Sequence, residues 1–302
     1  MATRHKNVIS YVREPTQDDS GRLAFQYFEL CDWDLCTFAE NMAAVKRRNP
    51  SDNEARFFLH SIVAALEHCH ACGVFHFDIK PDNILTRAGV VKVADFGSAF
   101  ISDDARHRRH HLQHLLQQPQ QQQESPTPLS PSTTSDADAD ADADADRDRD
   151  SWSPGPAASP PPPPQLPLPL PNPLCSGTEG YLPPEAFCAT YGREAASFTY
   201  AGCRDVWSLA ITIYAIRSGF MPWEDAGGYD ERFIAWCEAY ERDDSAALAN
   251  MLTDGGRLDI CVEFIELLVR MLHPRPALRL TIAEVQANPW LQKKEIEIQL
   301  KS

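Results

Sequence analysis

The chain has 302 residues, of which 43% are hydrophobic, and a formal net charge of −15. This length allows one large domain or two modest ones with a sizeable core. The acidic balance argues against nucleic acid or an anionic membrane as the main partner. The nine cysteines show no disulfide-framework spacing, which indicates a reducing compartment.

The apolar segments of the chain do not suit a membrane protein. The opening residues, MATRHKNVIS, contain no apolar signal segment. The longest apolar run, residues 206–216, is too short to span a bilayer and is closed by Arg217. We therefore expect a soluble protein of the cytoplasm or nucleus with no membrane partner.

The first third of the chain predicts a hairpin, a helix and several short strands. Residues 7–12 and 22–30 read as two strands that the polar turn PTQDDSG separates. A helix over 51–72 is predicted by a capping box of Ser51 and Glu54 and by apolar residues at helical spacing. In 74–97, Val and Ile alternate with charged residues around a Gly turn, which favours small strands beside loops.

Residues 102–174 interrupt this pattern with a composition that cannot form a core. Fifteen of the chain's 24 prolines lie there, together with a Gln run and an Asp-Ala alternation. Such a segment buries too little apolar surface to offset its ordering entropy, so we expect disorder. The run at 160–171 favours polyproline II, which SH3 and WW domains bind, although an unselected spacer fits equally well.

The pattern after residue 175 is helical. Residues 204–217 are apolar nearly all round, which is typical of a buried helix. Another helix is predicted near 260–272, and a last one begins at Thr281, where Glu284 completes a second capping box. With the hairpin and the short strands, this predicts the α+β class with a mainly helical second part.

Three dispersed motifs resemble the protein kinase signature in the right order: HFDIKPDNIL (76–85), ADFG (94–97) and GTEGYLPPE (177–185). DVWSLA (205–210) and RPALRLT (275–281), followed by NPW, add to the match. The chain thus resembles the eukaryotic serine/threonine protein kinases, and more weakly their calcium/calmodulin-dependent and checkpoint-like members. The resemblance implies a protein-kinase-like fold that would transfer the γ-phosphate of ATP to hydroxyl groups of a protein substrate.

The resemblance also implies a division of the chain. The expected parts are an incomplete N-lobe at 1–30 with only a hairpin remnant, a first C-lobe part at 31–101, the disordered insert at 102–174, a second C-lobe part at 175–292, and a tail at 293–302.

The motifs assign the catalytic roles position by position. Asp78 would accept the substrate's hydroxyl proton, Lys80 would neutralise charge on the transferring phosphoryl group, and Thr178 fits the serine/threonine type. Asn83 and Asp95 would hold the Mg²⁺ ions that bridge the phosphates of ATP.

The remaining assignments concern the nucleotide and the framework. In the hinge, FELC at 28–31, Phe28 would be the gatekeeper, the backbone of Glu29 and Cys31 would bond adenine, and Leu85 would pack beneath the ring. The framework residues implied are an ion pair, a brace for the catalytic loop and two members of a hydrophobic spine: Glu185 with Arg279, Asp205, and His76 with Phe96.

The sequence departs from the family in two important places. No Gly-rich phosphate loop and no strand Lys with a helix Glu partner precede His5, so we expect little transfer activity from these 302 residues alone. The usual Arg before the catalytic Asp is Phe77, which argues against activation-loop phosphorylation as the main switch. A truncated gene model, an unusual isoform and a non-catalytic kinase relative that acts in docking or as a scaffold all fit the first departure.

Overall fold

In a computed structural model, the structure describes residues 4–18, 22–105, 177–187 and 200–293. These ranges all belong to one compact unit, Met1–His111 with Pro171–Ser302. The expected disorder falls almost wholly on 106–174, outside the described residues. Within the described ranges, no helix is both long and apolar enough to cross a bilayer.

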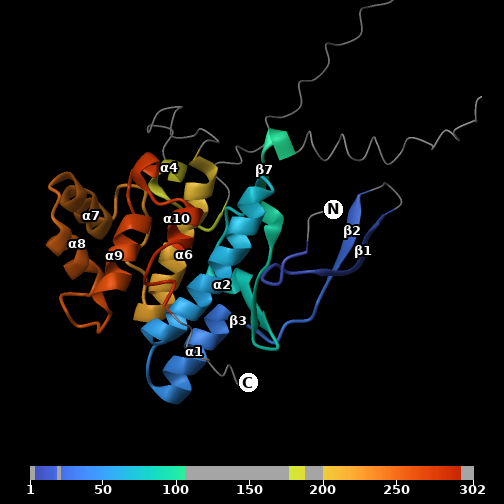
Figure 1. Ribbon diagram of the computed structural model, residues 1–302, viewed down its shortest axis with the longest axis horizontal. Helices are drawn as coiled ribbons and strands as arrows, with labels where there is room; N and C mark the ends of the chain where they lie inside the picture. The colour runs from blue at the N-terminus through green and yellow to red at the C-terminus, as the bar shows by residue number, and fades with distance from the viewer. Residues whose placement is uncertain (1–3, 19–21, 106–176, 188–199, 294–302) are drawn as a thin grey trace, which may run out of the picture. The chain divides into compact units, whose positions relative to one another are not determined.

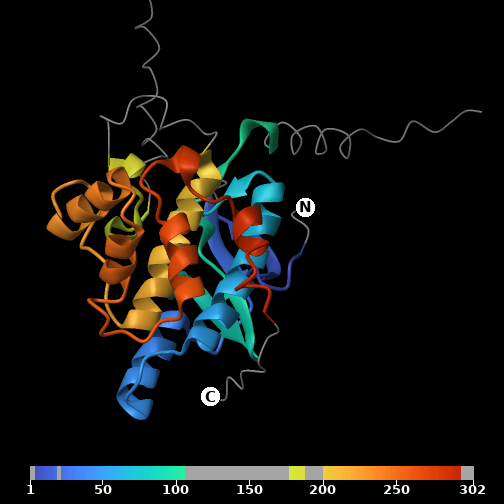
Figure 2. The ribbon, with the colours of Figure 1, turned by 60° about the vertical axis from the view of Figure 1, so that its left-hand side comes forward.

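The helical part is built around α6 (Ala201–Ser218), in which 15 of 18 residues are buried. The predicted helix at 204–217 is thus confirmed and begins three residues earlier. α2 (Asp52–Ala71) lies beside α6 in both views (Figures 1 and 2), and α9 (Val262–Met271) packs on α6 as well. Trp207 and Tyr214 of α6 are fully buried in this core.

The remaining helices complete this part of the fold. The helix predicted from Thr281 is α10 (Ile282–Gln286), and its capping box with Glu284 is present. Within the ranges that the structure describes, four further α-helices were not predicted from the sequence: α1 (Leu35–Lys46), α4 (Pro184–Phe187), α7 (Glu231–Glu241) and α8 (Ser245–Leu252).

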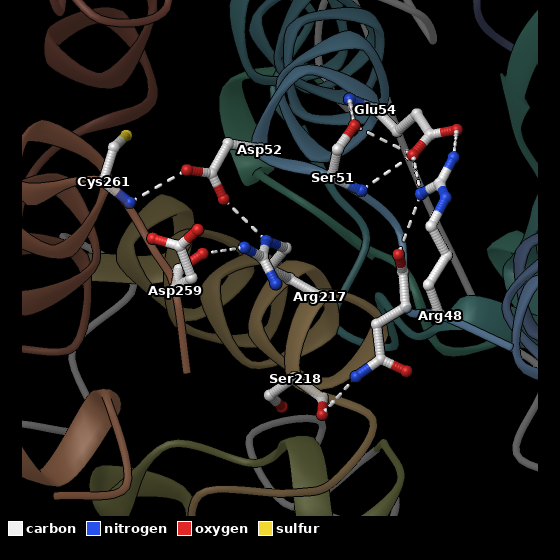
Figure 3. Close-up of polar contacts among 9 residues, drawn as sticks. Arg48, Ser51, Asp52, Glu54, Arg217, Ser218, Asp259 and Cys261 are labelled. Atoms are coloured by element: carbon white, nitrogen blue, oxygen red, sulfur yellow. Dashed lines mark hydrogen bonds and ion pairs between the residues drawn. The ribbon is translucent and has the colours of Figure 1, made fainter. Parts of the chain in front are cut away.

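Polar contacts fasten the start of α2 to the end of α6 (Figure 3). The carboxylate of Asp52 accepts from Arg217 Nε at 2.6 Å and from the backbone N–H of Cys261 at 2.8 Å. Ser51 and Glu54 form the predicted capping box, and Arg48 pairs with Glu54 at 2.8 Å. The capping box satisfies free N–H groups at the start of α2, and the Asp52 contacts fasten that start to the end of α6.

Short strands flank the loop that carries the kinase-like motif. β3 (Trp33–Asp34), β5 (Ile84–Arg87) and β6 (Val90–Val93) form one antiparallel sheet, and β4 (Val74–Phe75) pairs with β7 (Phe100–Ile101). Gly73, at a φ of 72°, turns the chain from α2 into β4; a Cβ there would lie 2.4 Å from Ser102 Oγ. The expected small strands, and with the helices the α+β class, are confirmed.

The predicted hairpin exists, but its first strand was placed too early. The two strands are β1 (Tyr11–Gln17) and β2 (Leu23–Phe28), which pair antiparallel. Residues 7–9, which we assigned to the first strand, pair with β6 instead: Val93 N donates to Asn7 O, and Ile9 N donates to Val93 O. The start of the chain is thus held by the sheet of the helical part, and part of the predicted turn becomes strand.

We expect the 302-residue chain to self-associate through this hairpin at micromolar concentration. Val12, Phe25 and Leu30 are exposed large apolar residues on or just after its strands, and a two-stranded hairpin is only marginally stable in water. Val12→Lys should shift gel filtration toward monomer, whereas Val45→Lys, the same change at an exposed position of α1, should not. A wild-type chain that elutes as monomer would contradict this prediction.

Replacing residues 106–174 with a short Gly/Ser linker is expected to leave the melting temperature within about 5 °C of its original value. The linker should start after Ala105, because Ser102 N still donates to the carbonyl of Gly73 at 2.9 Å. A larger fall, measured by calorimetry on both chains, would mean that the replaced residues make stabilising contacts worth roughly 1–2 kcal/mol or more.

Candidate active site

The loop that carries Asp78 is held from below by a carboxylate of α6. Asp205 is fully buried, and its two oxygens accept from the backbone N–H groups of His76 at 2.8 Å and Phe77 at 2.7 Å. His70 Nε2 lies 2.7 Å from the same carboxylate. Burial raises the pKa of Asp205, but the bonds from His70 and its charge outweigh this and hold the pKa below its ordinary value. An ionised carboxylate thus fixes the loop backbone.

Asp78 sits in a closed group of polar side chains. Thr178 Oγ1 donates to Asp78 Oδ1 at 2.7 Å, and Lys80 Nζ donates to Thr178 Oγ1 at 2.8 Å. Lys80 Nζ also lies 3.2 Å from Asp78 Oδ2. Partial burial raises the pKa of Asp78, but the Thr178 and Lys80 contacts outweigh it, so the pKa lies below its ordinary value. The carboxylate is therefore ionised near neutral pH and can accept a hydrogen bond from a hydroxyl group.

Asn83 joins this group and connects it to the segment around Asp95. Its amide nitrogen donates to the Asp78 backbone oxygen at 2.8 Å and to Asp78 Oδ2 at 3.2 Å. The backbone carbonyl of Asn83 accepts from the backbone N–H of Ala94, the residue before Asp95, at 2.9 Å. Asp95 has a left-handed backbone, φ 59°, and is exposed. Its carboxylate accepts from Gly97 N at 3.1 Å.

His76 and Phe96 lie between these two segments. The His76 ring is buried, its Nε2 is 2.9 Å from the carbonyl of Ala94, and its centroid is 4.7 Å from that of Phe96. Burial lowers the pKa of His76, so the ring is neutral at physiological pH and packs as a polar core residue. The two spine candidates are thus in contact.

The ion pair of Glu185 with Arg279 is a buried bidentate contact. Arg279 Nη1 and Nη2 lie 2.7 and 2.9 Å from the two carboxylate oxygens of Glu185. Arg279 also donates to the carbonyls of Cys203 and His273 and stacks over the ring of Trp207 at 4.8 Å. One guanidinium therefore fastens α4 to the start of α6.

Phe77, in place of the usual Arg, forms aromatic instead of ionic contacts. It is buried, its ring is nearly parallel to that of Phe100 at 5.9 Å, and the Arg204 guanidinium lies 4.1 Å above it. Its φ of 65° is left-handed, a costly conformation for a residue with a side chain. The Asp205 contact and this packing together hold it there.

The residues that the resemblance assigns to the hinge lie where β2 runs toward β3. Phe28 is partly exposed and stacks on Tyr11 at 4.6 Å. Glu29 N donates to Ser10 O at 3.0 Å, and the thiol of Cys31 is 3.8 Å from the Glu29 carbonyl. Leu85 is half-buried on β5 and pairs with Asp34 of β3. The structure thus brings the predicted adenine contacts next to the sheet that leads to Asn83 and Asp95.

Sequence reasoning missed several partners of these residues. His70 contacts Asp205, Arg204 covers Phe77, and the Glu29 side chain is paired with Arg87 and Lys92. A lysine inside the apolar strand VVKV was the available signal for the last of these, since lysine is almost never buried unpaired. The other two depend on contacts between residues more than a hundred positions apart.

A family profile described as "Protein kinase domain" matches residues 1–144. "CBL-interacting protein kinase 31" of Oryza sativa subsp. japonica is 23% identical over 245 residues, 80% of this chain and 36% of that protein. "Calcium/calmodulin-dependent protein kinase kinase cmkC" of Emericella nidulans is 21% identical over 282 residues, 91% of this chain and 38% of that protein. The chain thus spans little more than a third of the length of the curated relatives it matches.

Proposed function

We propose that this chain is a eukaryotic serine/threonine protein kinase that transfers the γ-phosphate of ATP to hydroxyl groups of proteins, because residues 1–144 match the protein kinase profile and the chain is similar to curated protein kinases. The observation that carries the proposal is the contact of Asp78 with Thr178, Lys80 and Asn83. A base, a cation and an amide gathered at one point suit a reaction that depends on positioning and electrostatics.

Each side chain has a distinct role in this proposal. Asp78, ionised near neutral pH, orients the substrate hydroxyl and accepts its proton. Lys80 balances the charge that develops on the transferring phosphoryl group. Thr178 fixes the positions of the Asp78 and Lys80 side chains relative to each other, because its hydroxyl is hydrogen-bonded to both. The hinge backbone at Glu29 and Cys31 would hold adenine, with Leu85 packing beneath the ring and Phe28 as gatekeeper.

The donor atoms fit the Mg²⁺ that such a reaction needs. The amide nitrogen of Asn83 is committed to Asp78, which leaves its oxygen for a cation, and Asp95 contributes an exposed carboxylate. Among the described residues, no three His, Cys, Asp or Glu side chains form a metal cluster. One amide oxygen and one carboxylate suit Mg²⁺, which takes one or two protein oxygens and fills its shell with phosphate oxygens and water. When bound, the ion neutralises charge on the phosphates.

Phosphate transfer from labelled ATP to a panel of Ser/Thr peptides tests the proposal. The 302 residues are assayed alone and also behind the N-terminal lobe of a curated relative joined ahead of His5. We expect weak transfer from the first protein and robust transfer from the second, because a Gly-rich loop and a strand Lys add phosphate positioning. Transfer in neither would favour the alternative, a non-catalytic docking or scaffold protein.

The proposed substrate is a protein that carries the Ser or Thr hydroxyl to which the phosphate is transferred. A partner with an SH3 or WW domain at 160–171 stays a prediction, because that run lies outside the described residues.

A further inference from the structure

The carboxylate of Glu29 is buried in the hinge and bound by three groups. Its side chain is only 6% exposed. One oxygen accepts from the backbone N–H of Ser10 at 3.0 Å and lies 2.8 Å from Lys92 Nζ, and the other lies 2.6 Å from Arg87 Nη1. Burial raises the pKa of Glu29, but the bonds from Lys92, Arg87 and Ser10 outweigh it and hold the pKa below its ordinary value. The Glu29 carboxylate is therefore ionised, and its three partners fix its position.

Both cationic partners of Glu29 belong to the β5–β6 hairpin. Arg87 ends β5, and Lys92 lies on β6 directly opposite Leu85. β5 begins immediately after Asn83, and β6 ends two residues before Asp95. The hairpin thus connects the hinge to both residues that would hold Mg²⁺, and it carries the side chain that would pack beneath adenine.

A second attachment holds the hinge on its other side. The backbone N–H of Asp32 donates to the carbonyl of Thr86 at 2.7 Å, and the Asp32 carboxylate accepts from the N–H of Ala88 at 2.7 Å. Residues 30–31 therefore lie between two points at which the chain is fastened to the same hairpin. A backbone segment fixed at both ends loses little further freedom when it binds a ligand.

The two cations contribute unequally to the attachment. The Lys92 side chain is 11% exposed and also donates to the carbonyl of Lys6 at 3.0 Å, whereas the Arg87 side chain is 51% exposed. Removing the Glu29 charge would leave the Lys92 ammonium buried without its carboxylate, a change that is much more costly than losing an exposed partner. The Glu29–Lys92 contact is therefore the main fastening, and Arg87 is an accessory to it.

We propose that the Glu29 side chain is a positioning residue for nucleotide binding, which ties the hinge to the β5–β6 hairpin so that the backbone at Glu29 and Cys31 matches the edge of adenine. This inference rests on the proposed function, since it concerns the same nucleotide. Glu29 acts through the hinge backbone and through Leu85 and does not touch the reacting phosphate.

The test compares how Glu29→Gln changes the affinity for Mg·ATP and for Mg·tripolyphosphate, which lacks the base, by titration calorimetry on the full chain. We expect ATP to bind about tenfold more weakly, because one charge-assisted contact of the hinge is lost. Tripolyphosphate should bind as it does to the unsubstituted chain. A residue that only stabilised the fold would change both affinities alike.

Two further variants keep the result interpretable. Glu54→Gln is the matched control, since Glu54 is also a shielded carboxylate paired with an arginine, Arg48, but lies at the start of α2 (Figure 3). It should lower stability without weakening ATP binding. Should Glu29→Gln fail to fold, Arg87→Gln removes only the exposed partner, and ATP should then bind about two- to threefold more weakly.

Hydrogen exchange gives a readout that needs no ligand. In Glu29→Gln the amides of Ser10 and Asp32 should exchange faster, while those in the interior of α6 keep their protection. Equal ATP affinity in Glu29→Gln and Glu54→Gln, with unchanged exchange at the hinge, would overturn this inference and leave the proposed function standing. If neither of the two proteins assayed under the proposed function binds ATP, both this inference and the proposed function are overturned.

Discussion

Asp78→Asn is expected to lower the rate of phosphate transfer by about 10²–10⁴-fold while the affinity for ATP stays nearly unchanged. The base acts mainly in the transition state, so its loss should appear in kcat and not in the KM for ATP. Asn keeps the shape of Asp and can still accept from Thr178, but it cannot take up the proton. The measurement is steady-state transfer with varied ATP, in whichever of the two proteins described above is active.

A matched control separates this effect from a general loss of structure. Asp244→Asn makes the same change at the N-cap of α8, where the side chain accepts from Ala247 N, and Asn caps a helix as well as Asp does. It should leave kcat unchanged. An Asp78→Asn enzyme that kept most of its turnover would show that Asp78 is not the base.

Arg279→Met is expected to destabilise the fold by roughly 3–5 kcal/mol, because it leaves the carboxylate of Glu185 buried without a partner. Arg279 also donates to the carbonyls of Cys203 and His273, so the start of α6 and the segment after α9 lose contacts too. Urea denaturation followed by fluorescence measures the change, provided that the slope of the transition stays constant.

The double variant distinguishes an unpaired charge from lost packing. Glu185→Leu with Arg279→Met should cost less than the sum of the two single changes, since no charge then stays buried alone. The control is Arg257→Met, which removes a largely exposed pair with Asp254 and should change stability little. Additive losses in the double variant would mean that the ion pair itself contributes nothing beyond its packing.

The helices with clear local signals were predictable from the sequence. Ser51 with Glu54 and Thr281 with Glu284 mark two helix starts, because a capping box is satisfied within four residues and needs no distant partner. The apolar run of α6 is equally local. By contrast, α1, α7 and α8 each begin at a single Asp cap without a capping box, and their apolar side chains are less clearly confined to one face than those of α9, so the sequence pattern did not distinguish them from loops.

The first strand shows how tertiary pairing overrides a local reading. Residues 7–9 have strand-like side chains, and nothing in their own sequence says which strand they pair with. The backbone of Val93, more than eighty residues away, takes their hydrogen bonds, so β1 begins later than predicted. Strand partners are non-local by nature, whereas helix bonds are not.

The candidate active-site residues show the same contrast between local and distant signals. The sequence alone was enough to propose Asp78, Asn83 and Asp95, because their spacing within two short motifs is itself the signal. It also determined the α+β class and the family resemblance. Only the tertiary structure decided what holds these residues in place: Asp205 beneath the loop, the Phe100 and Arg204 contacts of Phe77, and the Lys92 and Arg87 contacts of Glu29. Motif residues are set by local spacing, but their supports come from distant segments whose proximity exists only once the core has formed.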